Sequence, residues 1–261
     1  MKSIFKIGFW LLIAISFFVI WGFSISVQNN KICTELFIQI ELNGRNSFIT
    51  NQDVEIELRN ANMHPVGKRL HDIDLLLLEN KIDAIAEVKK SSVSKNLDGS
   101  ITIKIIQRNP IARIINAGGR QYYLDEDGYQ MPLSDNYAAR VPVVTGYIND
   151  PFTELSANEI GNNKTLANTV KSDEVFSLVK FIRYDKFWNA QIQQINFAFN
   201  NDIQLIPTVG SHLIIFGDIE NMEGKFNKLK LFYTEGLNHS DWNLYDTINI
   251  KYKNQIICNK R

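Results

Sequence analysis

The histidines are the residues best suited to act as bases or metal ligands, but their spacing fits neither role. They are His64, His71, His212 and His239. None belongs to an HExxH pattern, and none adjoins a cysteine that it could activate as a nucleophile. The cysteines, Cys33 and Cys258, form no Cys/His spacing typical of zinc sites. The sequence therefore predicts neither a metal site nor a histidine-dependent reaction centre.

Two short motifs could still indicate an enzyme or a cation site. Ser-x-x-Lys, the acylating motif of penicillin-binding enzymes, begins at Ser3, Ser92 and Ser177, but no SDN or KTG accompanies it. Asp125-Glu126-Asp127-Gly128 lacks the downstream glutamate of an EF-hand and favours a hairpin turn. We expect no enzyme, no cofactor and no metal.

Charge and composition restrict the class of partner. The chain has 28 basic and 28 acidic residues, so it lacks the positive excess from which nucleic-acid binding gains its affinity. A length of 261 residues with 45% hydrophobic content suffices for two modest domains. We therefore expect protein partners and a membrane, and no nucleic acid.

The N-terminal region predicts a membrane anchor. Residues 7–27 carry no charge and are long enough to cross a hydrocarbon core. Lys2 and Lys6 precede this stretch, which places residues 1–6 in the cytoplasm and the bulk of the chain outside it. A cleaved signal peptide is the alternative, but the apolar stretch is long and no clear cleavage site follows.

Outside the cytoplasm Cys33 and Cys258 could form a disulfide, although two separate thiols are the simpler interpretation.

The stretch from Asp72 to Arg113 predicts a helix followed by a hairpin. Leu75, Leu78, Ile82 and Ile85 recur on one helical face, with Asp72 or Asp74 as the N-cap. Apolar residues then alternate with polar ones, as in a half-buried strand; they are Ile101, Ile103 and Ile105. Asp98-Gly99 supplies the turn before this strand, and Pro110 ends it.

Upstream of this block the pattern predicts one strand and one further helix. Leu36–Leu42 alternates, and Thr50 with Asp53 forms a capping box ahead of Val54, Leu58 and Ala61. The order from residue 34 to 107 is therefore strand, helix, helix, strand, strand, within an expected domain at residues 34–109.

Residues 110–261 are expected to form a mostly antiparallel β domain with two helices. The strands are expected at residues 111–115, 121–124, 141–145, 192–199, 203–206, 213–216, 247–252 and 255–258. One helix begins near Ser172 and the other covers residues 222–234, while residues 149–171 are expected to be a surface loop. The fold class is α+β.

The succession of motifs resembles one family. The element order matches a POTRA domain, and Gly67-Lys68, Ile73-Asp74-Leu75 and residues 107–112 resemble the POTRA domain of the FtsQ/DivIB division proteins. Further segments resemble that family's β domain: Tyr123–Gly128, Val141–Gly146, Phe216-Gly217, Lys228-Leu229 and Ile248–Tyr252. The resemblance covers nearly the whole chain in the family's order.

The resemblance implies a non-enzymatic, single-pass scaffold of the bacterial divisome, in the inner membrane at the division septum. It would hold FtsB/FtsL-type coiled-coil proteins and help to control septal peptidoglycan synthesis, with other division proteins contacting the POTRA domain and the transmembrane helix. Two alternatives remain: another POTRA-bearing transport or secretion factor, and a membrane-tethered cell-wall enzyme.

The expected partner site lies on the last two strands. Gln255–Cys258 comes last, so its outer edge is predicted to offer free backbone groups to a partner segment. The alternative is a plain edge strand blunted by Lys253, Lys260 and Arg261. In the FtsQ/DivIB family, which this chain resembles, the terminal strands bind FtsB. The expected contact residues are Tyr252, Asn254, Gln255, Ile256 and Ile257.

Overall fold

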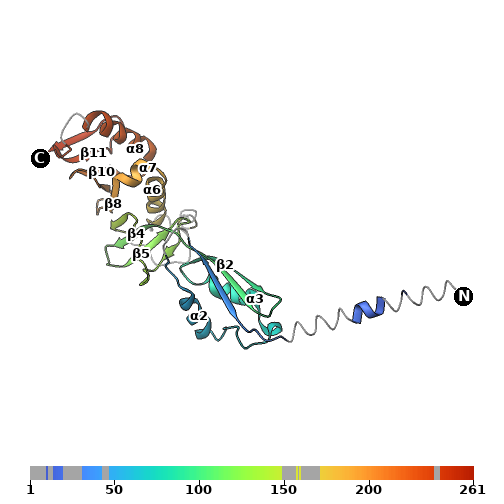
Figure 1. The fold of residues 1–261 in the computed structure, drawn as a ribbon. Helices are drawn as coiled ribbons and strands as arrows, with labels where there is room; N and C mark the ends of the chain where they lie inside the picture. Colours follow the sequence, from blue (N-terminus) through green and yellow to red (C-terminus); the bar gives the residue numbers. More distant parts are fainter. Residues whose placement is uncertain are drawn as a thin grey trace. The chain divides into compact units, whose positions relative to one another are not determined.

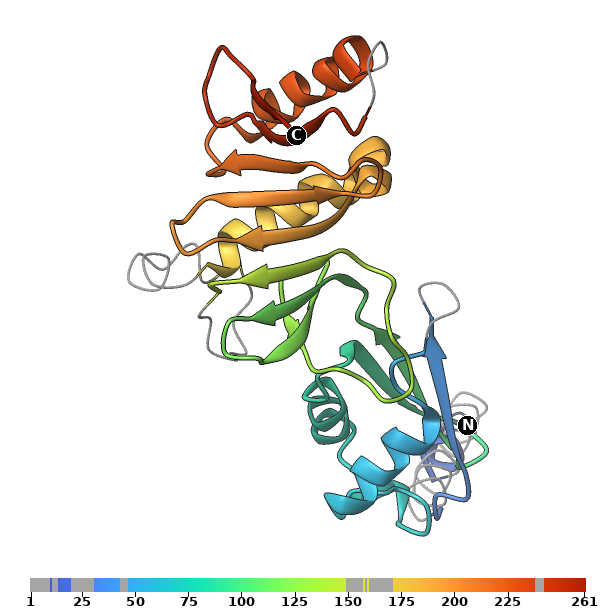
Figure 2. The same cartoon turned by 90° about the vertical axis from the view of Figure 1, so that its left-hand side faces the viewer.

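The computed structural model describes residues 10, 14–19, 31–42, 47–148, 157, 159, 171–237 and 242–261. The chain forms two compact units, Met1–Gln107 and Arg108–Arg261, and each is described by itself (Figures 1 and 2). The expected cytoplasmic tail, most of the expected transmembrane helix and most of the expected surface loop at 149–171 lie outside the described residues. Within the described residues, no helix has both the length and the apolar character needed to span a bilayer.

The first unit has the predicted order of elements around a three-stranded sheet. Its elements are β1 (Leu36–Glu41), α2 (Asn51–Asn60), a 3-10 turn (Leu70–Asp72), α3 (Leu75–Asp83), β2 (Val88–Lys95) and β3 (Ile101–Gln107). The central strand β3 pairs in parallel with β1 and antiparallel with β2. The strand-helix-helix-strand-strand prediction is confirmed.

Local sequence signals place both helices of this unit. Thr50 and Asp53 form the predicted capping box of α2, and the Asp74 carboxylate accepts a hydrogen bond from the Leu77 N–H at 3.1 Å, so Asp74 is the cap of α3. Leu78 and Ile82 are buried in the same cluster as the three alternating isoleucines of the central strand. Gly99 has the positive φ that the turn of the hairpin requires.

The second unit is one nine-stranded sheet with helices packed along it. In spatial order its strands are β12, β11, β10, β9, β8, β7, β4, β5 and β6. Their bounds are β4 (Pro110–Asn116), β5 (Gln121–Asp125), β6 (Gln130–Met131), β7 (Val143–Gly146), β8 (Ile192–Phe197), β9 (Ile203–Pro207), β10 (Leu213–Gly217), β11 (Tyr245–Asn249) and β12 (Ile257–Lys260). The helices are α6 (Ser172–Tyr184), α7 (Lys186–Gln191) and α8 (Met222–Leu231), followed by a π turn (Phe232–Gly236).

The sheet is mixed: five of its eight described strand pairs are antiparallel, as expected for most of the domain, and the expectation of two helices is corrected to three described helices. The pairs β4–β7, β7–β8 and β10–β11 are parallel. Parallel neighbours need a long crossover, and α6 with α7 supplies it before β8, as α8 does before β11. The helix α7 went unpredicted because it has only six residues, too few to show a period; Asp185 caps it.

Packing on the sheet comes from the faces that the sequence marks as apolar. Val175, Phe176, Val179 and Ile182 of α6 are all buried in the same cluster as Phe226 of α8 and the strand residues. Figures 1 and 2 show these helices along one side of the sheet. Gly146 of β7 has φ +106°, and a Cβ there would overlap the carbonyl oxygen of Phe197, so only glycine suits this position.

The β6 end of the sheet is closed. Gln130 and Met131, the whole of β6, are buried. Beside them Arg108 donates to the buried Asp125 carboxylate at 2.8 Å and lies 4.3 Å from the centre of the Tyr129 ring. Asp125 also accepts from the N–H groups of Asp127 and Tyr129, which confirms the predicted hairpin turn. Burial raises the pKa of Asp125, although the bond to Arg108 acts in the opposite direction.

Candidate partner-binding edge

The opposite end of the sheet carries the expected site. The strand β12 is the edge strand and pairs only with β11 among the strands that the structure describes. The expected strand at residues 247–252 instead ends at Asn249, and the one at 255–258 instead begins at Ile257. The side chain of Asn249 accepts a hydrogen bond from the Lys251 N–H at 3.0 Å, and this local bond replaces further ladder pairing.

Hydrogen-bond alternation identifies the backbone groups that face outward. The Ile250 N–H donates to the Ile215 carbonyl at 2.9 Å, so the even-numbered residues at this end of β11 point towards β10. The odd-numbered Asn249 and its partner Ile257 therefore bond to each other. By the same alternation Cys258 and Lys260 direct their N–H and C=O groups away from the sheet. Among the strands that the structure describes, none occupies this edge, so a further strand could pair there.

The structure brings the five expected contact residues together, mostly outside the strand. Tyr252, Asn254 and Gln255 are exposed in the connection from β11 to β12, which here means residues 250–256. Ile256 in the same connection is half-buried and packs against the core. Ile257 alone of the five belongs to β12, and its side chain is 43% exposed. No contact with a partner is part of this structure, so their role stays a prediction.

Lys228 of α8 holds this connection in place. Its Nζ donates to the carbonyl oxygens of Ile250 at 2.9 Å and Gln255 at 3.3 Å, and also to that of Tyr252. The ammonium group of Lys228 thus donates hydrogen bonds to three carbonyl groups, which come from both ends of the connection. Partial burial lowers the pKa of Lys228, and the nearby charge of Lys225 lowers it further. The sequence showed Lys228 only as part of a family segment and did not indicate this contact.

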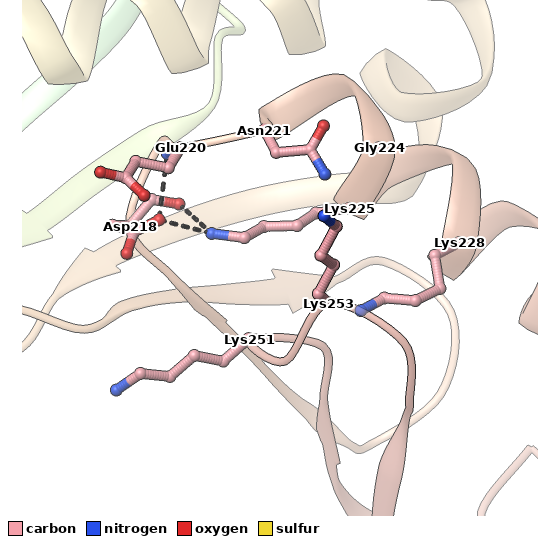
Figure 3. Close-up of a pocket in the computed structure, with 8 residues that line it drawn as sticks. All are labelled: Asp218, Glu220, Asn221, Gly224, Lys225, Lys228, Lys251 and Lys253. Atoms are coloured by element: carbon pink, nitrogen blue, oxygen red, sulfur yellow. Dashed lines mark hydrogen bonds and ion pairs between the residues drawn. The ribbon is translucent and has the colours of Figure 1, made fainter.

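A cavity of about 440 Å³ lies beside this lysine. Figure 3 shows the residues that line it: Asp218, Glu220, Asn221, Gly224, Lys225, Lys228, Lys251 and Lys253. The Lys225 Nζ lies 2.6 Å from an Asp218 carboxylate oxygen, and this bond lowers the pKa of Asp218. Lys251 extends away from the other lysines and lies 2.7 Å from Asp202. The lining has four lysines and two carboxylates, and with Asp202 beside Lys251 it keeps an excess of one positive charge, which suits an acidic partner.

The residues that first suggested chemistry do not form a reaction centre in the described part of the chain. His212 is buried and lies 2.8 Å from the Tyr233 hydroxyl, which is a structural contact in the core. Cys33 and Cys258 are both free thiols. Ser92 lies exposed on β2, and Ser177 lies exposed on α6. Among the described residues no three His, Cys, Asp or Glu side chains gather as metal ligands. His239 lies outside the described residues.

Comparison with known proteins gives the same assignment for both units. Residues 109–259 match the family described as FtsQ/DivIB, C-terminal related, and residues 31–106 match the POTRA-like domain. The cell division protein FtsQ of Salinibacter ruber is 24% identical over 202 residues, which cover 75% of this chain and 73% of the relative. The FtsQ of Rhodothermus marinus is 24% identical over 208 residues, covering 77% and 71%. The first match spans more than half of the chain, and the chain therefore belongs to the FtsQ/DivIB-related family of cell division proteins.

Proposed function

We propose that this protein is a non-enzymatic scaffold of the bacterial divisome, which holds FtsB/FtsL-type coiled-coil partners at the β12 edge and so helps to control septal peptidoglycan synthesis. Residues 1–6 are cytoplasmic, residues 7–27 anchor the chain in the inner membrane, and the POTRA domain (34–109) and β domain (110–261) lie on the far side, at the septum. Other division proteins contact the POTRA domain and the transmembrane helix.

The open edge of β12 is the observation that carries this proposal. Cys258 and Lys260 offer outward backbone donors and acceptors, and an extended partner segment can pair with them as a tenth strand. The connection held by Lys228 lies next to this edge and presents the ring of Tyr252, which is 47% exposed. A partner that adds a strand and rests an apolar or acidic residue on this connection would use both surfaces.

A proline at Lys260 tests the edge directly. Lys260→Pro removes one outward donor and leaves the inward bonds of β12 to β11 in place, so the fold should survive. We expect at least about a tenfold loss of affinity for a purified FtsB/FtsL-type complex, because one strand bond is lost and the proline ring occupies the place of the outward N–H. Lys260→Ala is the matched control, since it removes the charge and keeps the donor.

Two results would contradict the edge proposal. One is normal binding by a folded Lys260→Pro protein, with cells of normal length. The other is an equal loss in Lys260→Ala, which would assign the effect to the side chain. Ile256→Pro is a weaker test, because Ile256 lies before β12 and packs against the core.

The proposed topology has a separate test. A reporter enzyme that is active only outside the cytoplasm, fused after Arg261, should be active, because residues 7–27 are uncharged and Lys2 and Lys6 precede them. Activity of a cytoplasm-only reporter at the same position would show that the topology is wrong and would leave the edge test unaffected.

A further inference from the structure

A second exposed surface lies at one end of the POTRA-like unit, where the described chain begins again at Lys31. Ile32 and Leu97 are apolar side chains that are 55% and 81% exposed. Lys68 and Arg69 are exposed cations in the loop beside Ile32. We name these five residues, Lys31, Ile32, Lys68, Arg69 and Leu97, the tip. Neither the partner edge nor the unit's core uses them.

Backbone hydrogen bonds hold the tip together. Leu70 N–H donates to the Lys31 carbonyl at 2.9 Å, and Cys33 N–H donates to the Lys68 carbonyl at 2.8 Å. Ile32 and Arg69 form an antiparallel bridge between these two bonds. The Lys31 Nζ donates to the Leu97 carbonyl at 2.9 Å, which joins the β2–β3 turn to the same assembly. The exposed groups are therefore fixed relative to one another by the folded backbone.

Chain length places the tip close to a membrane. This step rests on the proposed anchor at residues 7–27, which only Gln28, Asn29 and Asn30 separate from Lys31. Four extended residues span at most about 14 Å. The headgroup layer on one side of a bilayer is about 6 Å thick. Lys31 is thus held within or just outside the headgroup layer, and the structural bonds hold Ile32 and Leu97 beside it.

The chemistry of the tip matches a lipid surface of negative charge. Exposed leucine and isoleucine side chains gain free energy by entering the boundary between headgroups and acyl chains. Anionic headgroups attract the three cations of the tip, Lys31, Lys68 and Arg69. The carboxylate of Asp98, which follows Leu97 in the β2–β3 turn, opposes this attraction. We propose that the tip docks on the anionic lipid surface around the anchor and so orients the POTRA-like unit against the membrane.

The experiment measures lipid contact in the full chain. Leu97→Cys in a Cys258→Ser background carries an environment-sensitive dye, while Cys33 is buried and resists labelling. The protein is inserted into vesicles of phosphatidylcholine and phosphatidylglycerol that contain doxyl-labelled lipid as quencher. Phe199→Cys is the matched control, because Phe199 is 80% exposed in a turn of the second unit. Lys68→Glu with Arg69→Glu reverses two of the three positive charges of the tip, leaves that of Lys31, and keeps the backbone bonds.

We expect the dye at position 97 to be quenched at least about twofold more strongly than the dye at 199, as burial at the headgroup boundary requires. Quenching should fall in vesicles of phosphatidylcholine alone and in the double glutamate variant. Equal quenching at 97 and 199 overturns the proposal. So does a dye at 97 that is shielded only after the division partners are added, because the tip would then be a protein surface.

Flotation after an alkaline wash separates this inference from the proposed function. Protein that floats with the vesicles but shows no excess quenching at position 97 keeps its anchor and disproves the tip contact alone. Protein that does not float disproves the anchor at residues 7–27, and it also disproves the lipid contact of the tip, which depends on that anchor. Quenching that is equal with neutral and anionic vesicles disproves the role of charge.

Discussion

The two edges of the nine-stranded sheet differ in exposure: the edge strand β6 is buried, whereas the edge strand β12 is exposed enough to pair with a further strand. The strand β6 is short and buried. In the ion pair beside it, Arg108–Asp125, the carboxylate is the buried partner, since the Asp125 side chain is fully buried. The β12 end is open, and its ion pair instead hides the cation, because Lys225 is nearly buried while Asp218 is exposed. An exposed edge strand can pair with a strand of another chain unless charged residues, proline or a β-bulge prevent the pairing. The contrast therefore supports the assignment of the partner surface to the β12 end.

The largest effect on stability is expected at the closed end. Asp125→Asn leaves one acceptor oxygen where two served Arg108 and the N–H groups of Asp127 and Tyr129, which should cost about 3 kcal/mol of unfolding free energy. Urea unfolding followed by tryptophan fluorescence, to which the buried Trp188 contributes, measures this cost. Asp218→Asn, the equivalent change at the open end, should cost less than about 1 kcal/mol because the Asp218 side chain is mostly exposed. Equal losses in the two variants would contradict the contrast.

An intermediate effect is expected for Lys228, and it should appear more in binding than in stability. Lys228→Met keeps the length of the side chain but frees the three carbonyls of the connection, with an expected loss of about 1 kcal/mol. Partner affinity should fall about tenfold, because the connection must then be ordered on binding. Lys253→Met is the control, since Lys253 lines the same cavity and is exposed. A normal affinity of Lys228→Met in titration calorimetry would show that the connection needs no such support.

The smallest effect is expected in the pH dependence, where the two carboxylates have opposite signs. Asp125 has a raised pKa in the folded state, so its contribution makes the protein less stable as pH rises through the window just above the ordinary aspartate value. Asp218 has a lowered pKa, so its contribution is present above that value and is lost as pH falls below it. Melting temperatures of wild type and the two asparagine variants between about pH 3 and 6 should show both slopes. Slopes of the same sign would contradict these assignments.

Local signals made much of the fold predictable. The capping box at Thr50, the cap at Asp74 and the alternating isoleucines of β3 all depend on neighbours a few residues away. The parallel pairings were not predictable, because strand direction depends on how the crossover helices return the chain to the sheet. The role of Lys228 escaped prediction for the same reason, since the carbonyls that it binds lie 22 to 27 residues further along the chain. The end of β11 was misplaced because the pattern cannot show that the Asn249 side chain competes for a backbone donor.

The order of strands in the second unit also determines when its open edge can exist. The strand β12 pairs with β11, which pairs with β10, and α8 lies between β10 and β11 in the chain. Ribosomes make a chain from its N-terminus, so β12 follows all its sheet neighbours in time as well as in space. A product that stops before Ile257 has a different edge, formed by β11, and lacks the outward groups of Cys258 and Lys260. If partners pair with the β12 edge as proposed, such incomplete chains would lack the strand that the partners need.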